Sequence, residues 1–300
     1  MSWLARFPIL RTYAALRAQT AQLTTAKAEV RQLRDRTAEI PRLKQQTEDV
    51  YRQLDVHQSS VVSPKTLKQI LKGGGQHYRD AAPFPNIVLD NFLDPELLAR
   101  VTGEFEKMDR SGWKRTSNAL ERKRSTADET TFGPLTRRVF ATLNSSQFLT
   151  FLEELTGISG LIADPHLRGG GLHEIERGGL LGVHADFNHY QRLNIWRRLN
   201  LLIYLNTSWD ESWGGHLELW DRSRKECVTR IAPSFNRAVI FDTSNFSYHG
   251  HPHPLNCPEG QSRKSLALYY YTVDYPYDDD RTPHSTLFMA EAAQSERRDE

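Results

Sequence analysis

GGLLGVHADF, residues 178–187, places His184 and Asp186 two positions apart behind a short apolar run. In an extended strand the side-chain period is two, so both side chains would point to the same face. An imidazole and a carboxylate that point the same way supply two of the three protein ligands in a common type of metal site. We therefore predict a strand that enters a buried metal site.

A third ligand is expected downstream in SYHGHPHP, residues 247–254, which contains three histidines. His249 is our first choice, and His251 and His253 are its alternatives. Two histidines and one carboxylate on one side of a metal, with the other side open, form the facial triad of non-haem Fe(II) oxygenases. A histidine and an aspartate two residues apart often occur by chance, so this prediction depends on the residues that follow.

The segment RKSLALYYYT, residues 263–272, begins with a cation and continues as an apolar strand. Arg263 and Ser265 would share one face of that strand. An arginine that points into a barrel is costly unless an anion meets it, and a guanidinium beside a hydroxyl fits a carboxylate. This pattern favours a site for the distal carboxylate of 2-oxoglutarate. An internal arginine–aspartate bridge and an outward-facing arginine are the alternatives.

The composition excludes several classes of protein. The 300 residues include 39 basic and 37 acidic side chains, so the net charge of +2 does not predict nucleic-acid or membrane binding. Cys227 and Cys257 are too few for a disulfide framework and are expected to be thiols in a reducing compartment. The apolar start is broken by Arg6 and Pro8, and no run approaches the roughly 20 apolar residues of a membrane span. We expect a cytoplasmic protein.

Residues 10–56 differ from the rest, because they lack glycine and are rich in good helix formers. Their apolar residues keep a heptad spacing that shifts near Pro41, which would kink or end a helix. This pattern predicts an imperfect coiled coil in two segments that assembles a homo-oligomer. A single helix packed on the domain and a solvated charged helix are the alternatives.

The chain is expected to contain four parts: a helical region over 1–56, a linker over 57–82, a catalytic domain over 83–276 and a polar tail over 277–300. Within the catalytic domain we predict a strand at 86–89, a helix capped by Asp94, a surface loop at 113–130 and two helices within 135–156. Short strands separated by turn signals then follow to residue 272. This order predicts a mainly β fold, an antiparallel jelly roll with helices on one side.

HAD at 184–186, HGHP at 249–252 and RKS at 263–265 occur in this order. Together with the segments 83–98, 197–221 and 233–272, they resemble the iron(II)- and 2-oxoglutarate-dependent dioxygenases, in particular the prolyl 4-hydroxylase-like branch. The resemblance covers about residues 83–275. It implies a double-stranded β-helix, Fe(II) and 2-oxoglutarate as cofactors with ascorbate as a candidate addition, and O2 as cosubstrate. The implied reaction hydroxylates a C–H bond and releases succinate and CO2.

The resemblance also implies roles for single residues, and it implies no catalytic residue beyond the metal ligands. His173 is a core histidine or a neighbour of the substrate or of the 2-oxoglutarate C1 carboxylate. The implied iron ligands are His184, Asp186 and His249, and the implied cosubstrate-binding residues are Arg263, Tyr204 and Ser265.

The substrate is left open between peptidyl proline and a small molecule. The tryptophans 196, 209, 213 and 220 are candidates for a substrate groove, with packing in the core as the alternative. A non-catalytic, cupin-like binding module assembled through the N-terminal helix is the second hypothesis. Such a module has no need for an inward cation at Arg263. A metal hydrolase fits poorly, because no HExxH motif is present.

Overall fold

The computed structural model describes residues 8–58, 60–275 and 282–289. The chain divides into two compact units, Met1–Gln58 and Ser59–Glu300. In the first unit the described residues form one helix, α1 (Pro8–Gln58). Helix α1 continues through Pro41, so the proline does not end the helix. The proline ring holds a φ close to the helical value, so a long helix can accommodate it at the loss of one hydrogen bond.

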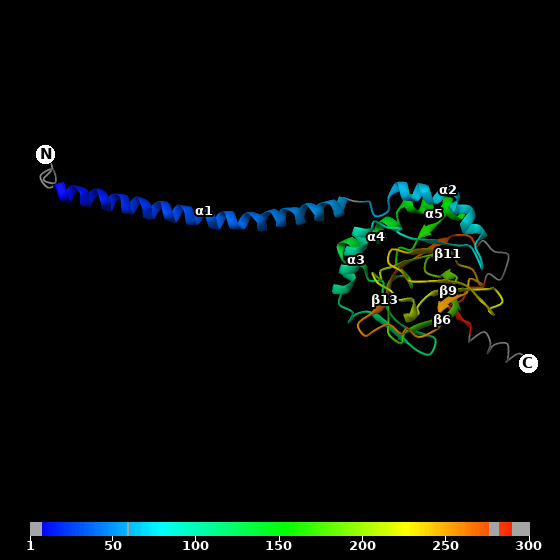
Figure 1. Cartoon of the computed structure of the whole chain (residues 1–300). Coiled ribbons are helices and arrows are strands. Elements are labelled where there is room, and N and C mark those ends of the chain that lie inside the picture. The colour runs from blue at the N-terminus through cyan, green and yellow to red at the C-terminus, as the bar shows by residue number, and fades with distance from the viewer. Residues whose placement is uncertain (1–7, 59, 276–281, 290–300) are drawn as a thin grey trace, which may run out of the picture. The chain divides into compact units, whose positions relative to one another are not determined.

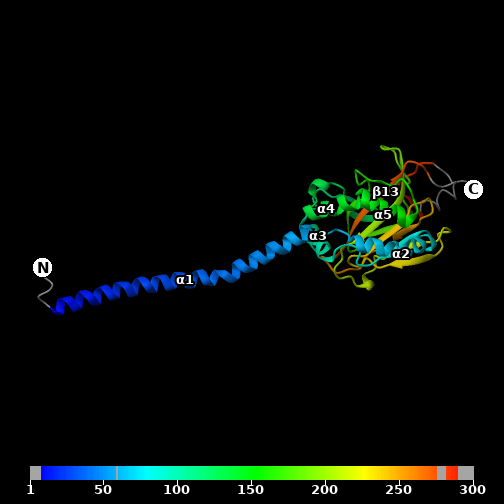
Figure 2. The same ribbon diagram turned by 90° about the horizontal axis from the view of Figure 1, so that it is seen from above.

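Helices α2 to α5 of the second unit gather on one side of its strands (Figure 1, Figure 2). Asp94 begins α3 as predicted, since its Oδ1 accepts a hydrogen bond from the Leu97 N–H at 2.8 Å. Gly157 ends α5 with a φ of 77°, which glycine adopts without strain. The helical elements are α2 (Pro64–Asp80), α3 (Pro95–Lys107), η2 (Glu129–Thr131), α4 (Pro134–Leu143), α5 (Ser146–Thr156) and η3 (Glu211–Trp213).

The predicted linker over 57–82 is wrong for residues 64–80, which form α2. Gly73, with a φ of 94°, takes up a kink, and the helix resumes after it. A Cβ atom on Gly75 would lie 3.2 Å from the Leu155 carbonyl oxygen, so the glycine allows α2 to pack closely on α5. Tyr78 is buried. Tertiary packing therefore stabilises a helix that the glycine-rich sequence does not favour.

The strands of the second unit form one sheet whose ladders are all antiparallel. The strands are β1 (Asn86–Leu89), β2 (Lys114–Ser117), β3 (Glu121–Thr126), β4 (Ile162–Ala163), β5 (Gly171–Glu176), β6 (Leu180–Ala185), β7 (His189–Tyr190), β8 (Ile195–Tyr204), β9 (Leu217–Trp220), β10 (Cys227–Ile231), β11 (Ala238–Asp242), β12 (His249–His251), β13 (Ser262–Thr272) and β14 (Leu287–Phe288).

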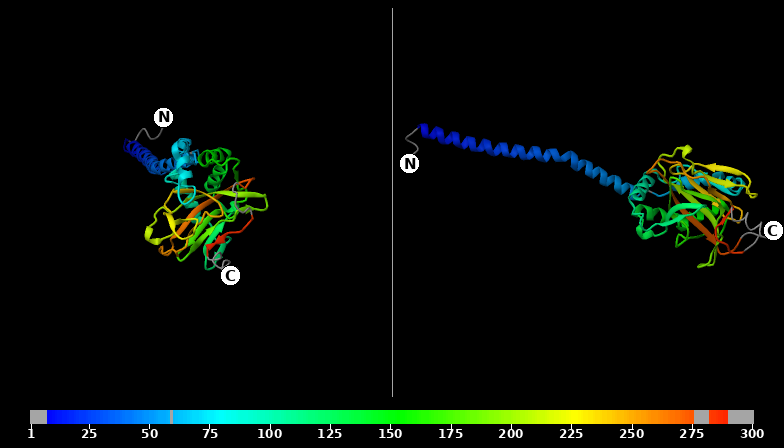
Figure 3. Two further views of the ribbon diagram at one scale, coloured as in Figure 1. Left: turned by 90° about the vertical axis from the view of Figure 1, so that its right-hand side faces the viewer. Right: turned by 90° about the horizontal axis from the view of Figure 1, so that it is seen from below.

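The strand order along the sheet is β1-β11-β8-β13-β5-β3-β6-β12-β9-β10. The sheet curls round on itself (Figure 3). Side chains from β6 and β12 therefore share one cavity with side chains from β8 and β13. In the ladder between β6 and β12, His184 lies directly opposite His249. The predicted jelly roll with flanking helices is confirmed, and the register of the ladder between β6 and β12 brings the two histidines together.

Two segments that were expected to be irregular form strands. Residues 113–130, predicted as a surface loop, contain the hairpin β2–β3. The hairpin lacks an apolar face because Glu121, Lys123 and Ser125 alternate along β3 and all line the polar cavity. Within the predicted tail, the described residues 282–289 include β14, which pairs with β6. The other residues of that tail lie outside the described part.

Two observations bear on the expected compartment. The Cys227 and Cys257 thiols are not joined in a disulfide. Among the described helices, none combines the length and the apolar character that a membrane span requires.

Candidate active site

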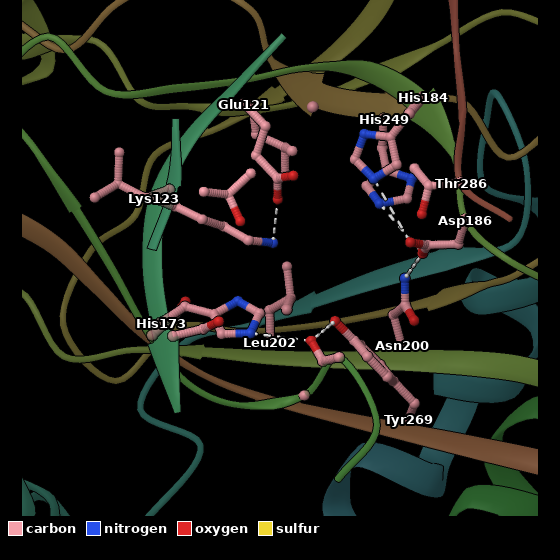
Figure 4. A pocket seen from close by; sticks show the side chains of 18 of the residues that line it. Glu121, Lys123, His173, His184, Asp186, Asn200, Leu202, His249, Tyr269 and Thr286 are labelled. Carbon is pink, nitrogen blue, oxygen red and sulfur yellow. Dashed lines mark hydrogen bonds and ion pairs between the residues drawn. The ribbon is translucent and has the colours of Figure 1, made fainter. Parts of the chain in front are cut away.

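A cavity of about 530 Å³ lies inside the curled sheet (Figure 4). Its walls come mainly from β3, β5, β6, β8, β12 and β13, and Thr286 and Phe288 of the C-terminal segment complete them. Two groups of side chains in this cavity carry the chemistry. We call His184, Asp186 and His249 the triad, and Arg263, Ser265 and His251 the Arg263 region.

The triad has the geometry of a metal site. Asp186 Oδ1 lies 3.5 Å from His184 Nε2, and Asp186 Oδ2 lies 3.4 Å from His249 Nε2. One ligand atom from each residue falls within 4.8 Å of the others, and all three residues are buried. A metal bound at about 2.1 Å holds neighbouring ligand atoms about 3 Å apart. These residues could therefore hold a divalent metal after a small contraction.

Both histidines of the triad are held in the ligand form by the backbone. His184 Nδ1–H donates to the Gly182 carbonyl at 2.8 Å, and His249 Nδ1–H donates to the Ser247 carbonyl at 2.9 Å. Each ring therefore presents the lone pair of Nε2 to the metal position. Burial lowers the pKa of His249 to about 4, although the Asp186 carboxylate opposes this shift. The His249 imidazole is thus neutral at pH 7.

Two side chains of β8 hold the third ligand, and Figure 4 shows one of them, Asn200. Asn200 Nδ2 donates to Asp186 Oδ2 at 2.7 Å, and Arg197 Nη2 lies 2.9 Å from the same oxygen. Arg197 Nε also donates to Asn200 Oδ1 at 3.0 Å, so the two side chains support one another. Burial by itself would raise the pKa of the Asp186 carboxyl, but Arg197 and the two histidines hold it well below its ordinary value. The ligand therefore stays ionised.

Arg197 and Asn200 were missed at the sequence level. A regular strand would place residues three apart on opposite faces. In the ladder of β8 with β13, Tyr270 pairs with Leu199 and Tyr271 with Arg197, so one extra residue forms a bulge. The bulge turns Arg197 to the same side as Asn200. A polar Asn200 within the apolar run of residues 199–203 was the one available signal.

Arg263 is buried, with 5% of its surface exposed. Its Nε–H donates to the Gly215 carbonyl at 2.8 Å, and its Nη2 donates to the Tyr204 hydroxyl at 3.1 Å. No carboxylate in the described part of the chain lies within 4 Å of its guanidinium. The alternatives of an internal bridge and an outward-facing arginine therefore do not apply. A buried charge without a counter-ion is costly, so the cavity is built to receive an anion beside Arg263.

The other two predicted cosubstrate residues lie next to Arg263. Ser265 is buried and lines the cavity. Tyr204 is fully buried behind the cavity wall, and it pairs with Ser265 across β8 and β13. Burial raises the pKa of the Tyr204 phenol, so its hydroxyl keeps the proton that it can donate. Direct contacts from Tyr204 and Ser265 to the cosubstrate remain predictions.

His173 borders the cavity, and it is therefore more than a core histidine (Figure 4). Its Nε2–H donates to the Gly169 carbonyl at 3.1 Å, which also accepts a hydrogen bond from the Tyr269 hydroxyl at 2.9 Å. Burial, with the positive charge of Lys123 next in size, lowers the pKa of His173 to about 3. Lys123 itself lies 2.8 Å from Glu121 Oε1.

The two alternatives to His249 lie outside the metal-holding group. His253 is exposed, and His251 is buried on the cavity wall. Both ring nitrogens of His251 are shielded from solvent and have no hydrogen-bond partner in the described part of the chain. Burial lowers the pKa of His251 well below its ordinary value, and the positive charge of Arg263 has the next largest effect.

The prediction of a tryptophan-lined groove is wrong. Trp209 and Trp213 pack against each other, with ring centroids 5.3 Å apart, and cover a small apolar cluster around Leu255. Trp196 packs on Tyr275 outside the cavity. Among the described residues that line the cavity, none is a tryptophan.

Comparison with known proteins agrees with this site. Residues 170–271 match the model of the 2OG-Fe(II) oxygenase superfamily. The matched residues include all three members of the triad, and the predicted resemblance to this superfamily is confirmed.

A stretch of 79 residues is 35% identical to mouse (Mus musculus) prolyl 3-hydroxylase OGFOD1 and covers 25% of this chain and 14% of that protein. A prolyl hydroxylase from Trichoplax adhaerens, solved with a hypoxia-inducible factor peptide, aligns with a TM-score of 0.53 at 16% identity, over 69% of this chain and 91% of that one. A prolyl 4-hydroxylase structure from Phytophthora capsici aligns with a TM-score of 0.53 at 18% identity, over 80% of this chain and 75% of that one. The structural matches show a shared fold.

Proposed function

We propose that the chain is an Fe(II)- and 2-oxoglutarate-dependent dioxygenase that hydroxylates a C–H bond and releases succinate and CO2. One observation carries the proposal: a single cavity holds both a metal-binding triad and a buried arginine without a counter-ion. A cupin-like binding module explains the triad, but it leaves the buried charge of Arg263 unexplained.

The metal and the cosubstrate would be bound by different residues. His184, Asp186 and His249 would hold the iron, which supplies the oxygen-activating redox chemistry when bound. Arg263, with Tyr204 and Ser265 beside it, would hold the distal carboxylate of 2-oxoglutarate.

The substrate that we propose is a prolyl residue of a peptide or a small molecule of similar shape. Support comes from the prolyl hydroxylases among the relatives. Ascorbate is proposed as an additional cofactor. The free thiols of Cys227 and Cys257 are consistent with a cytoplasmic site of action.

The test is 2-oxoglutarate turnover by iron-loaded full-length protein, measured as succinate. We expect slow succinate formation by the wild type and none by His249→Ala. His253→Ala is the matched control, because it removes an exposed histidine of the same segment and should behave as the wild type. Equal succinate formation by wild type and His249→Ala would contradict the proposal.

We also propose that α1 joins copies of the chain as a coiled coil, which would make residues 1–56 an assembly region and 83–276 the catalytic domain. Leu23 and Val30, and likewise Leu33 and Ile40, are seven residues apart, and all four side chains are more than half exposed. Light scattering should show an oligomer for the full chain and a monomer for Leu33→Asp. A monomeric wild type would contradict this proposal.

A further inference from the structure

His251 is a buried polar side chain on the cavity wall that neither the metal site nor the core explains. Only 3% of its surface is exposed, and no group in the described part of the chain meets either ring nitrogen. Buried polar side chains in folded proteins are almost always hydrogen-bonded, and exceptions call for a specific reason. A ligand that enters the cavity is such a reason, because it supplies the missing partner.

The position of His251 along β12 indicates which ligand group it would meet. It follows His249 by two residues, which is about 6.6 Å along a strand, with an irregularity in the ladder between them. This displacement is on the scale of the carbon skeleton of 2-oxoglutarate. His251 thus lies beyond the metal ligand, and it lines the same cavity as Arg263.

Arg263 leaves part of its donor capacity open on the same cavity. The Gly215 carbonyl and the Tyr204 hydroxyl take its Nε–H and one Nη2 hydrogen, and the other guanidinium N–H groups have no partner in the described residues. Lys123, the second cation near His251, is already matched by Glu121 at 2.8 Å. Arg263 and His251 are therefore available, together with the Ser265 hydroxyl, as donors to an incoming anion.

We propose that His251 is a cosubstrate-binding residue that donates a hydrogen bond to the distal carboxylate of 2-oxoglutarate beside Arg263. A carboxylate has about four acceptor sites, enough for an arginine and an imidazole together. A neutral imidazole carries one N–H, which can donate to the carboxylate. A rotation of the ring by 180° about Cβ–Cγ exchanges the positions of its nitrogens and its C–H groups, so a nitrogen can face the cavity. This inference depends on the proposed use of 2-oxoglutarate.

The experiment compares two ligands that differ only in the distal carboxylate, the group to which His251 would donate a hydrogen bond. Full-length protein is loaded with Mn(II), which binds without oxidative turnover, and titrated calorimetrically with 2-oxoglutarate and with 2-oxopentanoate, which lacks the distal carboxylate. The variants are His251→Val, which removes the donor, and His251→Gln, which keeps one. His253→Val is the matched control, since His253 is exposed in the same segment.

For His251→Val we expect 2-oxoglutarate binding to weaken by roughly 10-fold or more, as for a lost hydrogen bond to a charged group. Binding of 2-oxopentanoate should stay within about twofold, and His251→Gln should recover most of the affinity for 2-oxoglutarate. Unchanged 2-oxoglutarate binding by His251→Val, or an equal loss for both ligands, would overturn the assignment. A wild type that binds Mn(II) but neither oxoacid would overturn the proposed function as well.

A second measurement does not need His251→Val, in case that variant fails to fold. The wild type carries 15N-labelled histidine and Zn(II) in place of Mn(II), and its imidazole 15N spectrum is recorded with each oxoacid. The His251 signal, assigned from the His251→Gln spectrum, should shift with 2-oxoglutarate and not with 2-oxopentanoate. The same shift with both ligands would overturn the assignment.

Discussion

The triad and the Arg263 region share one cavity, but their polar groups are satisfied to very different degrees. Every triad member has a partner in the protein. The two histidines donate hydrogen bonds to backbone carbonyls, and Asp186 accepts a hydrogen bond from Asn200 and pairs with Arg197. In the Arg263 region, the guanidinium lacks a counter-ion and His251 lacks any partner in the described residues. The three candidate metal ligands are thus fixed by the protein itself, whereas polar groups of the Arg263 region are left open in the described residues.

Loss of a triad ligand should have the largest effect. Asp186→Ala removes the only carboxylate of the triad, and we expect succinate formation to fall by about 1,000-fold or more. Mn(II) affinity, measured by electron paramagnetic resonance, should fall in parallel. Asp109→Ala, at an exposed position, is the control. Retention of metal binding by Asp186→Ala would show that the triad is not the metal site.

Arg263→Met should affect the other half of the site in a different way. We expect the half-saturating concentration of 2-oxoglutarate to rise by roughly 100-fold, because charge-assisted hydrogen bonds to a carboxylate are lost. The rate should recover at saturating 2-oxoglutarate, since the triad is intact. In the absence of ligand, thermal stability should stay equal or increase, because an unpaired buried charge is removed. A marked drop in thermal stability would contradict this, because it would show that the hydrogen bonds from Arg263 to Gly215 and Tyr204 outweigh the cost of the buried charge.

Asn200→Ala tests whether the support behind the triad matters. It removes the hydrogen bond to Asp186 Oδ2 and leaves all three ligands in place. We expect about a 10-fold loss of metal affinity. Affinity for 2-oxoglutarate at saturating metal should be unchanged. If instead metal affinity is unchanged and 2-oxoglutarate binds more weakly, the assignment of metal binding to the triad and of 2-oxoglutarate binding to the Arg263 region is wrong.

The smallest effect concerns the pH dependence of folding. His173 has a pKa of about 3 in the folded state and an ordinary value of 6.5, so between these values the unfolded chain binds a proton that the native chain does not. The free energy of unfolding should therefore rise with pH across this window, by up to about 1.4 kcal/mol per pH unit for this group. His173→Phe should flatten the rise, measured by urea denaturation at pH 5 and pH 7. An unchanged pH dependence would show that His173 is not held neutral by burial.

The sequence predicted the parts of the site that depend on strand periodicity. His184, Asp186 and Arg263 follow from a side-chain period of two and from the cost of burying a charge. The jelly roll follows from the series of short strands with turn signals.

Other contributions to the site depend on tertiary context. Arg197 reaches Asp186 only through a bulge in β8, and a bulge has no reliable signature in one strand. Lys123 lies on the hairpin β2–β3, which has no apolar face. The side chains on its inner face are polar and line the cavity. His251 was treated only as an alternative metal ligand, because its missing partners become visible only when the fold buries it.

The most direct test of the two-part site is optical. Fe(II) protein is titrated with 2-oxoglutarate without oxygen, and the metal-to-ligand absorption band of the chelated cosubstrate is followed. We predict that the band appears with the wild type, is absent with Asp186→Ala, and needs far more 2-oxoglutarate with Arg263→Met. A wild type that binds Fe(II) but develops no band at saturating 2-oxoglutarate would contradict the account and favour a non-catalytic binding module.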